Sequence, residues 1–331
     1  MSQRSLSRST LLSIVIPVFN EEEVLPFLFS GLEQAATDLP VNVEIIMVND
    51  GSRDRSLDIL LAKARSDTRY RIVDLSRNFG HQLAVSAALS LARGDVVAIL
   101  DADLQDPPEL LGPMLARWQQ GIDVVYGQRD SREGETRFKR WSAGLFYCLL
   151  SWGADAEIPQ DTGDFRVMDR RVVEALNAMP ERHRFLRGMV AWLGFRQEPY
   201  RYSRRARRAG TTKYPFVKMF ALSMDALFSF SMKPLRWMAL AGLGMTTLGF
   251  VAVIALIVLR LQFPAVFIPG FATTMAALLS LFGFNFLCLG ILGEYLGRIF
   301  INVQGRPSYV IRDVYAAANL APDAAPHTGE S

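Results

Sequence analysis

Cysteine is scarce in this sequence, and glycine-rich phosphate-binding loops are missing. Cys148 lies in a mixed polar segment and Cys288 in an apolar run, so we expect neither a disulfide nor a cysteine metal site. The turn after the first apolar run reads VFNEEEV, without the Gly-x-Gly-x-x-Gly of dinucleotide-binding folds, and no P-loop sequence occurs. GLGMTTLG at residues 242–249 has the wrong spacing and lies in an apolar stretch. A nucleotide ligand would therefore have to be held without a glycine cradle.

Charged residues are absent from two long stretches, residues 237–259 and 261–293. About 20 apolar residues are enough for one helix to cross a bilayer. Prolines and a glycine between residues 264 and 270 interrupt the second stretch, so we predict two membrane helices at about 237–259 and 271–292. The alternative is that both segments are buried helices of a soluble core.

Basic residues flank this predicted hairpin on both sides. Lys218, Lys233 and Arg236 precede it and Arg298, Arg306 and Arg312 follow it, whereas the connecting turn has only Arg260 at its edge. Lysine and arginine mark the cytoplasmic side of membrane helices. Both long ends of the chain are therefore expected to be cytoplasmic.

Residues 11–130 alternate short β-rich runs with helical patterns. The runs LLSIVIPVF, VEIIMVND, RIVDLS, DVVAILDAD and DVVYGQR are rich in Val, Ile and Leu without polar alternation, which is typical of parallel strands covered on both faces. Amphipathic segments such as 54–66 and 80–92 separate them. This alternation predicts an open, doubly wound α/β sheet, in which ligands bind outside the carboxyl ends of the strands. Polar residues collect at those ends: Asn20, Glu21, Asn49, Asp50, Arg77, Asn78, Asp101, Asp103 and Arg129.

The remainder of the chain is predicted as follows. Helical patterns occur at 135–152, 169–179 and 183–194, and QDTGDFRVMD at 160–169 predicts a loop and a short strand. The predicted organisation is a flexible N-terminus at 1–10, an α/β domain at 11–213, juxtamembrane amphipathic helices at 214–236, a two-helix membrane hairpin at 237–292 and a cytoplasmic tail at 293–331, disordered after about residue 316.

The fourth β-rich run ends in the acidic stretch LDADLQDPPEL. Asp101 and Asp103 are one residue apart, so their side chains can point to the same side, where a divalent cation would relieve their repulsion. Mg²⁺ or Mn²⁺ typically uses one or two carboxylates together with substrate phosphates. Asp106 and Glu109 fit a helix start instead, with Asp106 as the cap and Glu109 near the positive end of the helix.

Seven motifs occur in the same order over nearly the whole chain: VIPVFNEEE, VNDGSRDRS, LSRNFGHQLA, LDADLQDPPE, DTGDFRVMDRR, RAGTTKYP and GEYLGRIF. Together they resemble the family-2 glycosyltransferases of the GT-A fold, and within them the polyprenyl-phosphate glycosyltransferases, such as bactoprenol glucosyltransferase, dolichol-phosphate mannose synthase and undecaprenyl-phosphate formamido-arabinose transferase. The resemblance implies a Rossmann-like, mostly parallel sheet. It also implies inverting transfer of a sugar from a nucleotide diphosphate to undecaprenyl or another polyprenyl phosphate, at the cytoplasmic face of a bacterial inner membrane.

The resemblance further implies site residues, a cofactor and partners. The nucleotide sugar would be bound by Pro17, Phe19, Glu21, Val48, Asp50, Asp101, Ala102 and Arg129. Asp103 and Gln105 would hold Mg²⁺ or Mn²⁺, Arg207 and Lys213 would bind donor or acceptor phosphate, and Asp161 and Asp164 lie in the loop where related enzymes carry a catalytic aspartate. A homo-oligomer is expected, and nucleic acid is not expected as a partner.

The chemistry of the acceptor qualifies the role of Asp164. A phosphate monoester has a second pKa near 6, so it is largely a dianion at pH 7 and needs little help from a general base. Asp164 can instead orient the acceptor or balance nearby arginines, or DTGDF can be a turn with capping aspartates. His81 in NFGHQ can likewise be a site residue or a helix-start residue without a chemical role.

Several alternatives stay open from the sequence. DTGDFR resembles the glucosyltransferase type, so UDP-glucose is the first expectation for the donor, with GDP-mannose and UDP-formamido-arabinose as alternatives. A processive polysaccharide synthase would have Gln-x-x-Arg-Trp before a larger membrane bundle, whereas this chain has KPLRW at 233–237 and two predicted spans. A membrane partner that binds nucleotide sugars without catalysis is the alternative outside the enzymes.

Overall fold

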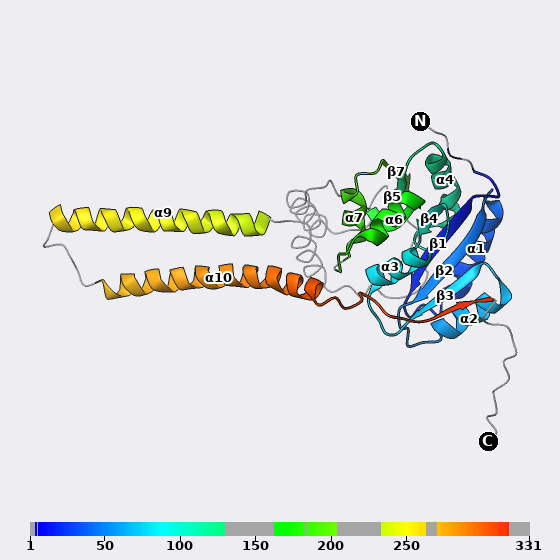
Figure 1. Ribbon diagram of the computed structural model, residues 1–331, viewed down its shortest axis with the longest axis horizontal. Coiled ribbons are helices and arrows are strands. Elements are labelled where there is room, and N and C mark those ends of the chain that lie inside the picture. Colours follow the sequence, from blue (N-terminus) through cyan, green and yellow to red (C-terminus); the bar gives the residue numbers. More distant parts are fainter. Residues whose placement is uncertain are drawn as a thin grey trace, which may run out of the picture. The chain divides into compact units, whose positions relative to one another are not determined.

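A computed structural model describes residue 4 and residues 6–129, 162–182, 184–203, 233–262 and 270–317. The described residues belong to two compact units (Figure 1). One unit contains a β-sheet with its covering helices, and the other contains two long helices.

The sheet has eight strands in the described residues. They are β1 (Leu11–Val18), β2 (Asn42–Asn49), β3 (Tyr70–Leu75), β4 (Val96–Ile99), β5 (Val124–Arg129), β6 (Thr162–Asp169), β7 (Gln197–Tyr202) and β8 (Ile311–Ala316), in the order β7-β5-β6-β4-β1-β2-β3-β8. β1 runs parallel to β2 and β4, and β2 runs parallel to β3. β6 is antiparallel between β4 and β5, and β8 is antiparallel to β3 at the edge.

This sheet confirms the predicted α/β class. All five predicted strands form β1 to β5, and the short strand expected within residues 160–169 is β6. β7 and β8 were not predicted. β8 lies in the segment expected to be a cytoplasmic tail, and it adds a strand to the sheet only because β3 offers it a free edge.

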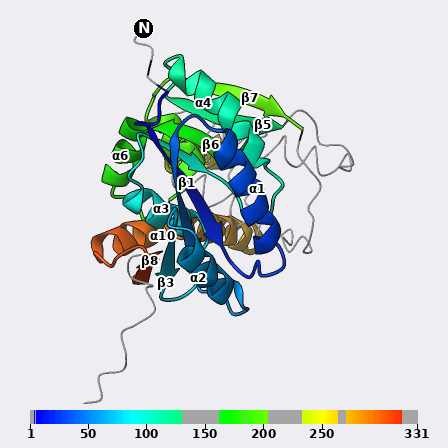
Figure 2. The ribbon, with the colours of Figure 1, turned by 90° about the vertical axis from the view of Figure 1, so that its right-hand side faces the viewer.

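Helices cover both faces of the sheet. They are α1 (Leu25–Asp38), α2 (Ser56–Ser66), α3 (His81–Leu91), the 3₁₀ helix η1 (Pro108–Leu110), α4 (Leu111–Gln119), α6 (Arg170–Ala178) and α7 (Leu186–Trp192). α1 contacts α2 and α4 on one face, whereas α3 packs against β1 and β2 on the other and contacts α6 (Figure 2). The helices predicted at 54–66, 80–92, 169–179 and 183–194 are therefore confirmed as α2, α3, α6 and α7, and the one predicted at 135–152 lies outside the described residues.

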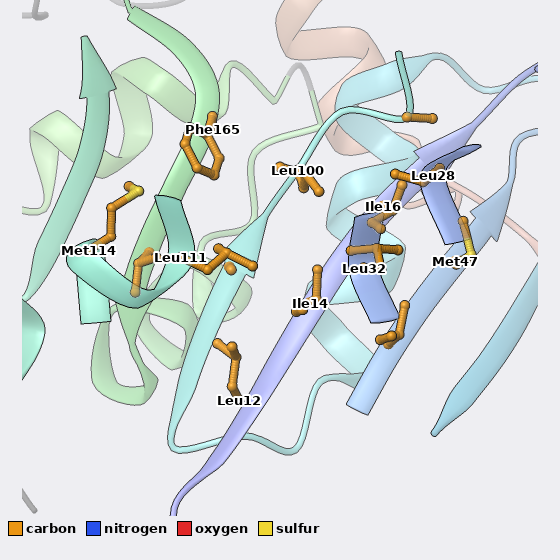
Figure 3. Packing of buried hydrophobic residues seen from close by; sticks show 14 of the residues in the cluster. Leu12, Ile14, Ile16, Leu28, Leu32, Met47, Leu100, Leu111, Met114 and Phe165 are labelled. Atoms are coloured by element: carbon orange, nitrogen blue, oxygen red, sulfur yellow. The ribbon is translucent and has the colours of Figure 1, made fainter. Parts of the chain in front are cut away.

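The core explains why β1 reads as a continuous apolar run. Leu12, Ile14 and Ile16 are fully buried, and Ile14 and Ile16 lie near Leu28 and Leu32 of α1 (Figure 3). Alternate residues of a strand point to opposite faces, so the residues between them face the side covered by α3 and must be apolar or small as well. Each fully buried Leu or Ile side chain contributes about 1.5–3 kcal/mol to folding.

Asp106 is not the helix cap that the sequence predicts. η1 begins at Pro108 with Pro107 before it, and no side chain forms a cap hydrogen bond there. A residue that precedes proline is forced into an extended conformation, and Pro107 adopts one with ψ 126°, so the helix starts later than predicted. Asp106 is instead fully buried and accepts a hydrogen bond from the hydroxyl of Tyr202 on β7. Glu109 does lie in the first turn of η1, as predicted.

The N-terminal segment, expected to be flexible, is attached to the domain at Arg4. The Arg4 guanidinium donates to the carbonyl of Trp118 at 2.9 Å and forms an ion pair with Asp169 at 3.0 Å. It also lies over the Trp118 ring, 5.2 Å from the ring centroid.

The second unit contains α9 (Lys233–Gln262) and α10 (Phe271–Val303), which contact each other. Both are longer than the predicted spans at 237–259 and 271–292. Within the described residues, one segment, Leu281–Val303, is long and apolar enough to cross a membrane, and the apolar part of α9, Trp237–Val251, is shorter. The two-span hairpin therefore stays a prediction. The juxtamembrane segment at 214–232 lies outside the described residues.

Candidate active site at the strand ends

The loops after β1 and β2 are tied to each other by hydrogen bonds. The backbone N–H of Asn20 donates to Ser52 Oγ at 3.1 Å, and that of Glu21 donates to Ser56 Oγ at 2.9 Å. Asn20 adopts a left-handed conformation with φ 54°. This local geometry leaves the ring of Phe19 43% exposed at the carboxyl end of the sheet, where a planar ligand could contact it.

Asp50 has a structural role at the end of β2. Its Oδ1 accepts the backbone N–H of Phe79 at 2.7 Å and its Oδ2 accepts that of Gly80 at 2.9 Å, so it holds the loop that leads into α3. Burial raises the pKa of Asp50, although these hydrogen bonds oppose the shift. Pro17 and Val48, which the resemblance assigns to nucleotide binding, are register neighbours on β1 and β2 and are buried.

A tight turn follows β4 and fixes the second acidic side chain. Asp103 is buried, and its Oδ1 accepts the backbone N–H of Gln105 at 3.1 Å. Leu104 between them has φ 56°, a left-handed conformation that is uncommon for leucine. Ala102 is buried. The turn thereby holds Asp101, Asp103 and Gln105 within one short loop at the carboxyl end of the sheet.

Asp101 carries an oxygen that the described residues leave without a hydrogen bond. Oδ1 is buried and has no donor there, and His81 Nε2 lies 3.6 Å away. Burial raises the pKa of Asp101 to about 6, and the nearby Asp164, Asp106 and Asp103 add to this, while His81 opposes it. An unsatisfied buried acceptor costs about 1–3 kcal/mol, which a ligand donor or a cation would relieve.

The described residues fit a divalent cation for which the protein supplies only some of the ligands. No group of three or more His, Cys, Asp or Glu side chains forms a metal cage in the described part of the chain. Mg²⁺ does not require such a cage, because one or two carboxylates and substrate phosphates usually complete its coordination. Asp103 and Gln105 could hold it, beside the unsatisfied oxygen of Asp101.

Asp164 on β6 is the most highly bonded carboxylate of the site. Its Oδ1 accepts Arg187 Nε at 2.7 Å, and its Oδ2 lies 3.0 Å from His81 Nε2 and accepts Gln82 Nε2 at 2.9 Å. Burial alone would raise its pKa, but Arg187 and His81 hold the pKa of Asp164 well below its usual range. Asp164 is therefore ionised at neutral pH and is a weak base.

His81 begins α3 and lies between two carboxylates. Burial alone would lower its pKa, but the hydrogen bond to Asp164 and the charge of Asp101 raise the pKa of His81 above its ordinary value. The imidazole therefore has a larger cationic fraction near neutral pH than an exposed histidine. This geometry favours the reading of His81 as a site residue.

Arg166 adds a buried cation behind Asp164. Its guanidinium donates to the backbone carbonyls of Asp164 and Gly163, each at 3.2 Å. Burial lowers the pKa of Arg166 to about 10, so the side chain stays charged at neutral pH.

The sequence indicated part of this cluster and missed part of it. Asp164 was predicted, whereas Gln82, Arg166 and Arg187 were not. Arg166 is two residues after Asp164 on β6, so the alternation of a strand could have placed both on one face. Arg187 lies in the first turn of α7, and no local pattern links it to Asp164.

Several predicted site residues cannot be placed. Asp161, Arg207 and Lys213 lie outside the described residues. Arg129 ends β5, and its side chain is likewise outside the described part.

Comparison with known proteins identifies relatives over almost the full length. The model of the family described as Glycosyl transferase family 2 matches residues 13–176. A Bacillus subtilis protein named "Uncharacterized glycosyltransferase YkcC" is 43% identical over 314 residues, which cover 95% of this chain and 97% of that protein. The SfII prophage-derived bactoprenol glucosyl transferase of Shigella flexneri is 37% identical over 301 residues, which cover 91% of this chain and 97% of that protein. The prophage bactoprenol glucosyl transferase homolog of Escherichia coli K12 is 36% identical and covers 92% and 99%.

Proposed function

The chain belongs to glycosyltransferase family 2, and from this premise we propose that it transfers glucose from UDP-glucose to a polyprenyl phosphate with inversion at the anomeric carbon. Glycosyl transfer and a polyprenyl-phosphate acceptor follow from relatives that are named bactoprenol glucosyl transferases. The identity of the donor as UDP-glucose and the inversion at the anomeric carbon are proposals. The cytoplasmic membrane face, the two-span anchor and the homo-oligomer are also proposals.

One observation supports the donor site above all. Asp101 and Asp103 lie in the same loop after β4, and Asp101 Oδ1 is buried without a hydrogen-bond donor in the described residues. A divalent cation that binds together with a nucleotide diphosphate would place positive charge next to this oxygen. The divalent cation, when bound, would neutralise the diphosphate that leaves. Phe19 is exposed at the same end of the sheet, where the base of the nucleotide could stack on it.

The chain's own residues position the reactants in this proposal. Asp164 is ionised and fully engaged by hydrogen bonds, so it is suited to orientation and not to accepting a proton. The acceptor phosphate is largely a dianion at pH 7 and has no proton that must be removed before it attacks. Asp161, Arg207 and Lys213 stay predicted contacts from the family resemblance.

The test supplies the purified full-length chain with undecaprenyl phosphate, Mg²⁺ or Mn²⁺ and a panel of radiolabelled UDP-glucose, GDP-mannose and UDP-formamido-arabinose. We expect label from UDP-glucose in a lipid-soluble product. Label from another donor would replace the donor assignment, and a polymeric product would favour a processive synthase. If no donor labels the lipid, the chain is not this enzyme, and donor binding without turnover would favour the non-catalytic partner.

Asp103→Ala tests the cation assignment in the same assay. We expect at least a 100-fold loss of metal-dependent turnover, since an electrostatic contact to developing charge is commonly worth about that factor. Glu109→Ala is the matched control, because Glu109 lies six residues further on, in the first turn of η1. Full activity of Asp103→Ala would remove Asp103 from the proposed cation site.

A further inference from the structure

Three basic side chains contact Asp164, two of them through its carboxylate and one through its backbone carbonyl. Arg187 and His81 contact its two oxygens at 2.7 and 3.0 Å, and Arg166 donates to its backbone carbonyl at 3.2 Å. The Asp164 side chain is only 5% exposed, whereas His81 is 39% and Arg187 31% exposed. The carboxylate is thus the buried part of the cluster, and His81 and Arg187 present their remaining surface to solvent.

The position of this cluster suits the second substrate of the reaction. His81 Nε2 lies 3.6 Å from Asp101 Oδ1, so the cluster adjoins the place proposed for the donor. A displacement at the anomeric carbon requires the attacking oxygen close to the donor sugar, within about 3–3.5 Å of the carbon. The acceptor phosphate must therefore bind beside the donor, and its two negative charges need cations other than the one that serves the diphosphate.

We infer that His81 and Arg187 bind the phosphate of the lipid acceptor and that Asp164 is the positioning residue that holds both. This inference rests on the proposed function. An arginine guanidinium and a protonated imidazole are strong donors to phosphate oxygens. Asp164 engages Arg187 through Nε and orders both side chains before a ligand arrives, which reduces the entropy lost on binding.

The reaction balances with this assignment. A phosphate oxygen forms the new bond to the anomeric carbon while the bond from that carbon to the donor diphosphate breaks, and the electron pair leaves with the nucleotide diphosphate. No proton is transferred in this step, because the attacking phosphate is already a dianion. An ionised Asp164 therefore fits a holding role and has no proton to accept.

The donor diphosphate is the other source of phosphate that this cluster could bind. The two sources are separated by measuring KM for undecaprenyl phosphate at saturating UDP-glucose, and the affinity for UDP-glucose with Mn²⁺ by calorimetry, on the full chain in detergent. For Arg187→Gln and His81→Asn we expect a KM for the lipid phosphate roughly 10- to 100-fold higher, the size of a lost charge-assisted hydrogen bond, with unchanged UDP-glucose affinity. Arg187→Lys should recover part of the loss because it keeps the charge.

Arg117→Gln on α4 is the matched control, since it removes an arginine that pairs with Glu198 on the surface, and its lipid KM should equal the wild-type value. Thermal unfolding of each variant identifies any that fail to fold. If Arg187→Gln does not fold, the single variants Arg187→Lys and His81→Asn serve as the test. An unchanged lipid KM in folded variants overturns the inference, and so does a loss confined to UDP-glucose affinity. A wild-type chain that labels no lipid with any donor overturns the proposed function, and this inference with it.

Discussion

Arg312 on β8 forms an ion pair with Asp74 on β3, with 3.1 Å between Nη1 and Oδ2, although the two residues are 238 positions apart in the chain. Asp74 is buried and also accepts a hydrogen bond from Asn49 at 2.7 Å. Arg312 further donates to the carbonyl of Ser76 at 2.9 Å. The segment after α10 is thereby attached to the edge of the sheet.

Arg312→Ala should loosen β8 from that edge. Arg312 is more than half exposed, so the expected loss of unfolding free energy is modest, about 0.5–1 kcal/mol. The backbone amides of residues 311–316 should exchange hydrogen faster, as measured by mass spectrometry. Arg306→Ala, an exposed arginine shortly before β8, is the control and should leave exchange unchanged. Equal protection of β8 in both variants would show that the ion pair does not hold the strand.

Gly51→Ala should destabilise the loop after β2. Gly51 has φ +66°, and a Cβ there would lie 2.6 Å from backbone atoms of Arg77 and Asn78. The left-handed conformation alone costs alanine about 1–2 kcal/mol, so the total loss should reach about 2 kcal/mol or more. Gly112→Ala in α4 is the matched control, since its Cβ would meet only Leu39 at 3.7 Å and alanine is the better helix former by about 1 kcal/mol. Chemical unfolding of both variants measures the difference, and equal stabilities would contradict the prediction.

The Asp164→Asn variant tests whether Asp164 positions other side chains or acts as a general base. Asparagine keeps the shape of the side chain, but it is neutral and has one acceptor oxygen in place of two, so it cannot hold Arg187 and His81 together. We expect the KM for lipid phosphate to rise roughly tenfold or more and kcat to fall by less. A kcat reduced by orders of magnitude at an unchanged lipid KM would instead identify Asp164 as the base. Asp58→Asn, at an exposed position in the first turn of α2, is the control.

Asp169 should make the stability of the domain depend on acidic pH. It accepts Trp118 Nε1 at 3.0 Å and the backbone N–H of Arg171 at 3.1 Å, and it pairs with Arg4. Burial alone would raise its pKa, but these hydrogen bonds and Arg4 lower the pKa of Asp169 below its usual value. A lowered folded-state pKa means that the stabilisation is present above the unfolded value, about 3.9, and is lost as the pH falls through the folded value.

Asp169→Asn should therefore unfold more easily than the wild type at pH 7, by about 1–3 kcal/mol, and this difference should shrink as the pH falls below about 4. Denaturant unfolding of the full chain in a non-ionic detergent, at several pH values, measures it. Glu174→Gln, which removes an exposed i,i+4 partner of Arg170, should show little difference at any pH. A difference between Asp169→Asn and wild type that stays constant down to pH 3 would contradict the assignment.

Local sequence was sufficient for the elements of the sheet domain. Apolar runs without polar alternation predicted β1 to β5, because a strand covered on both faces needs apolar residues at nearly every position. The carboxyl ends of these strands also marked the candidate site, since ligands bind at that edge of the sheet in this fold class. β8 could not be predicted, because its pairing with β3 depends on an edge supplied by residues far away in the chain.

The site shows the same division between sequence and tertiary structure. The sequence by itself determined the family, the acidic loop at Asp101 and Asp103, and the candidate Asp164, because these are carried by contiguous motifs. Only the tertiary structure decided what Asp164 contacts, since His81 lies 83 positions before it and Arg187 lies 23 after it. The tertiary structure also shows that Asp106, a helix cap in the prediction, is a buried hydrogen-bond partner of Tyr202, 96 positions away. The physical reason is that the charge state and partners of a carboxylate depend on the groups that folding brings near it, and sequence spacing does not specify them.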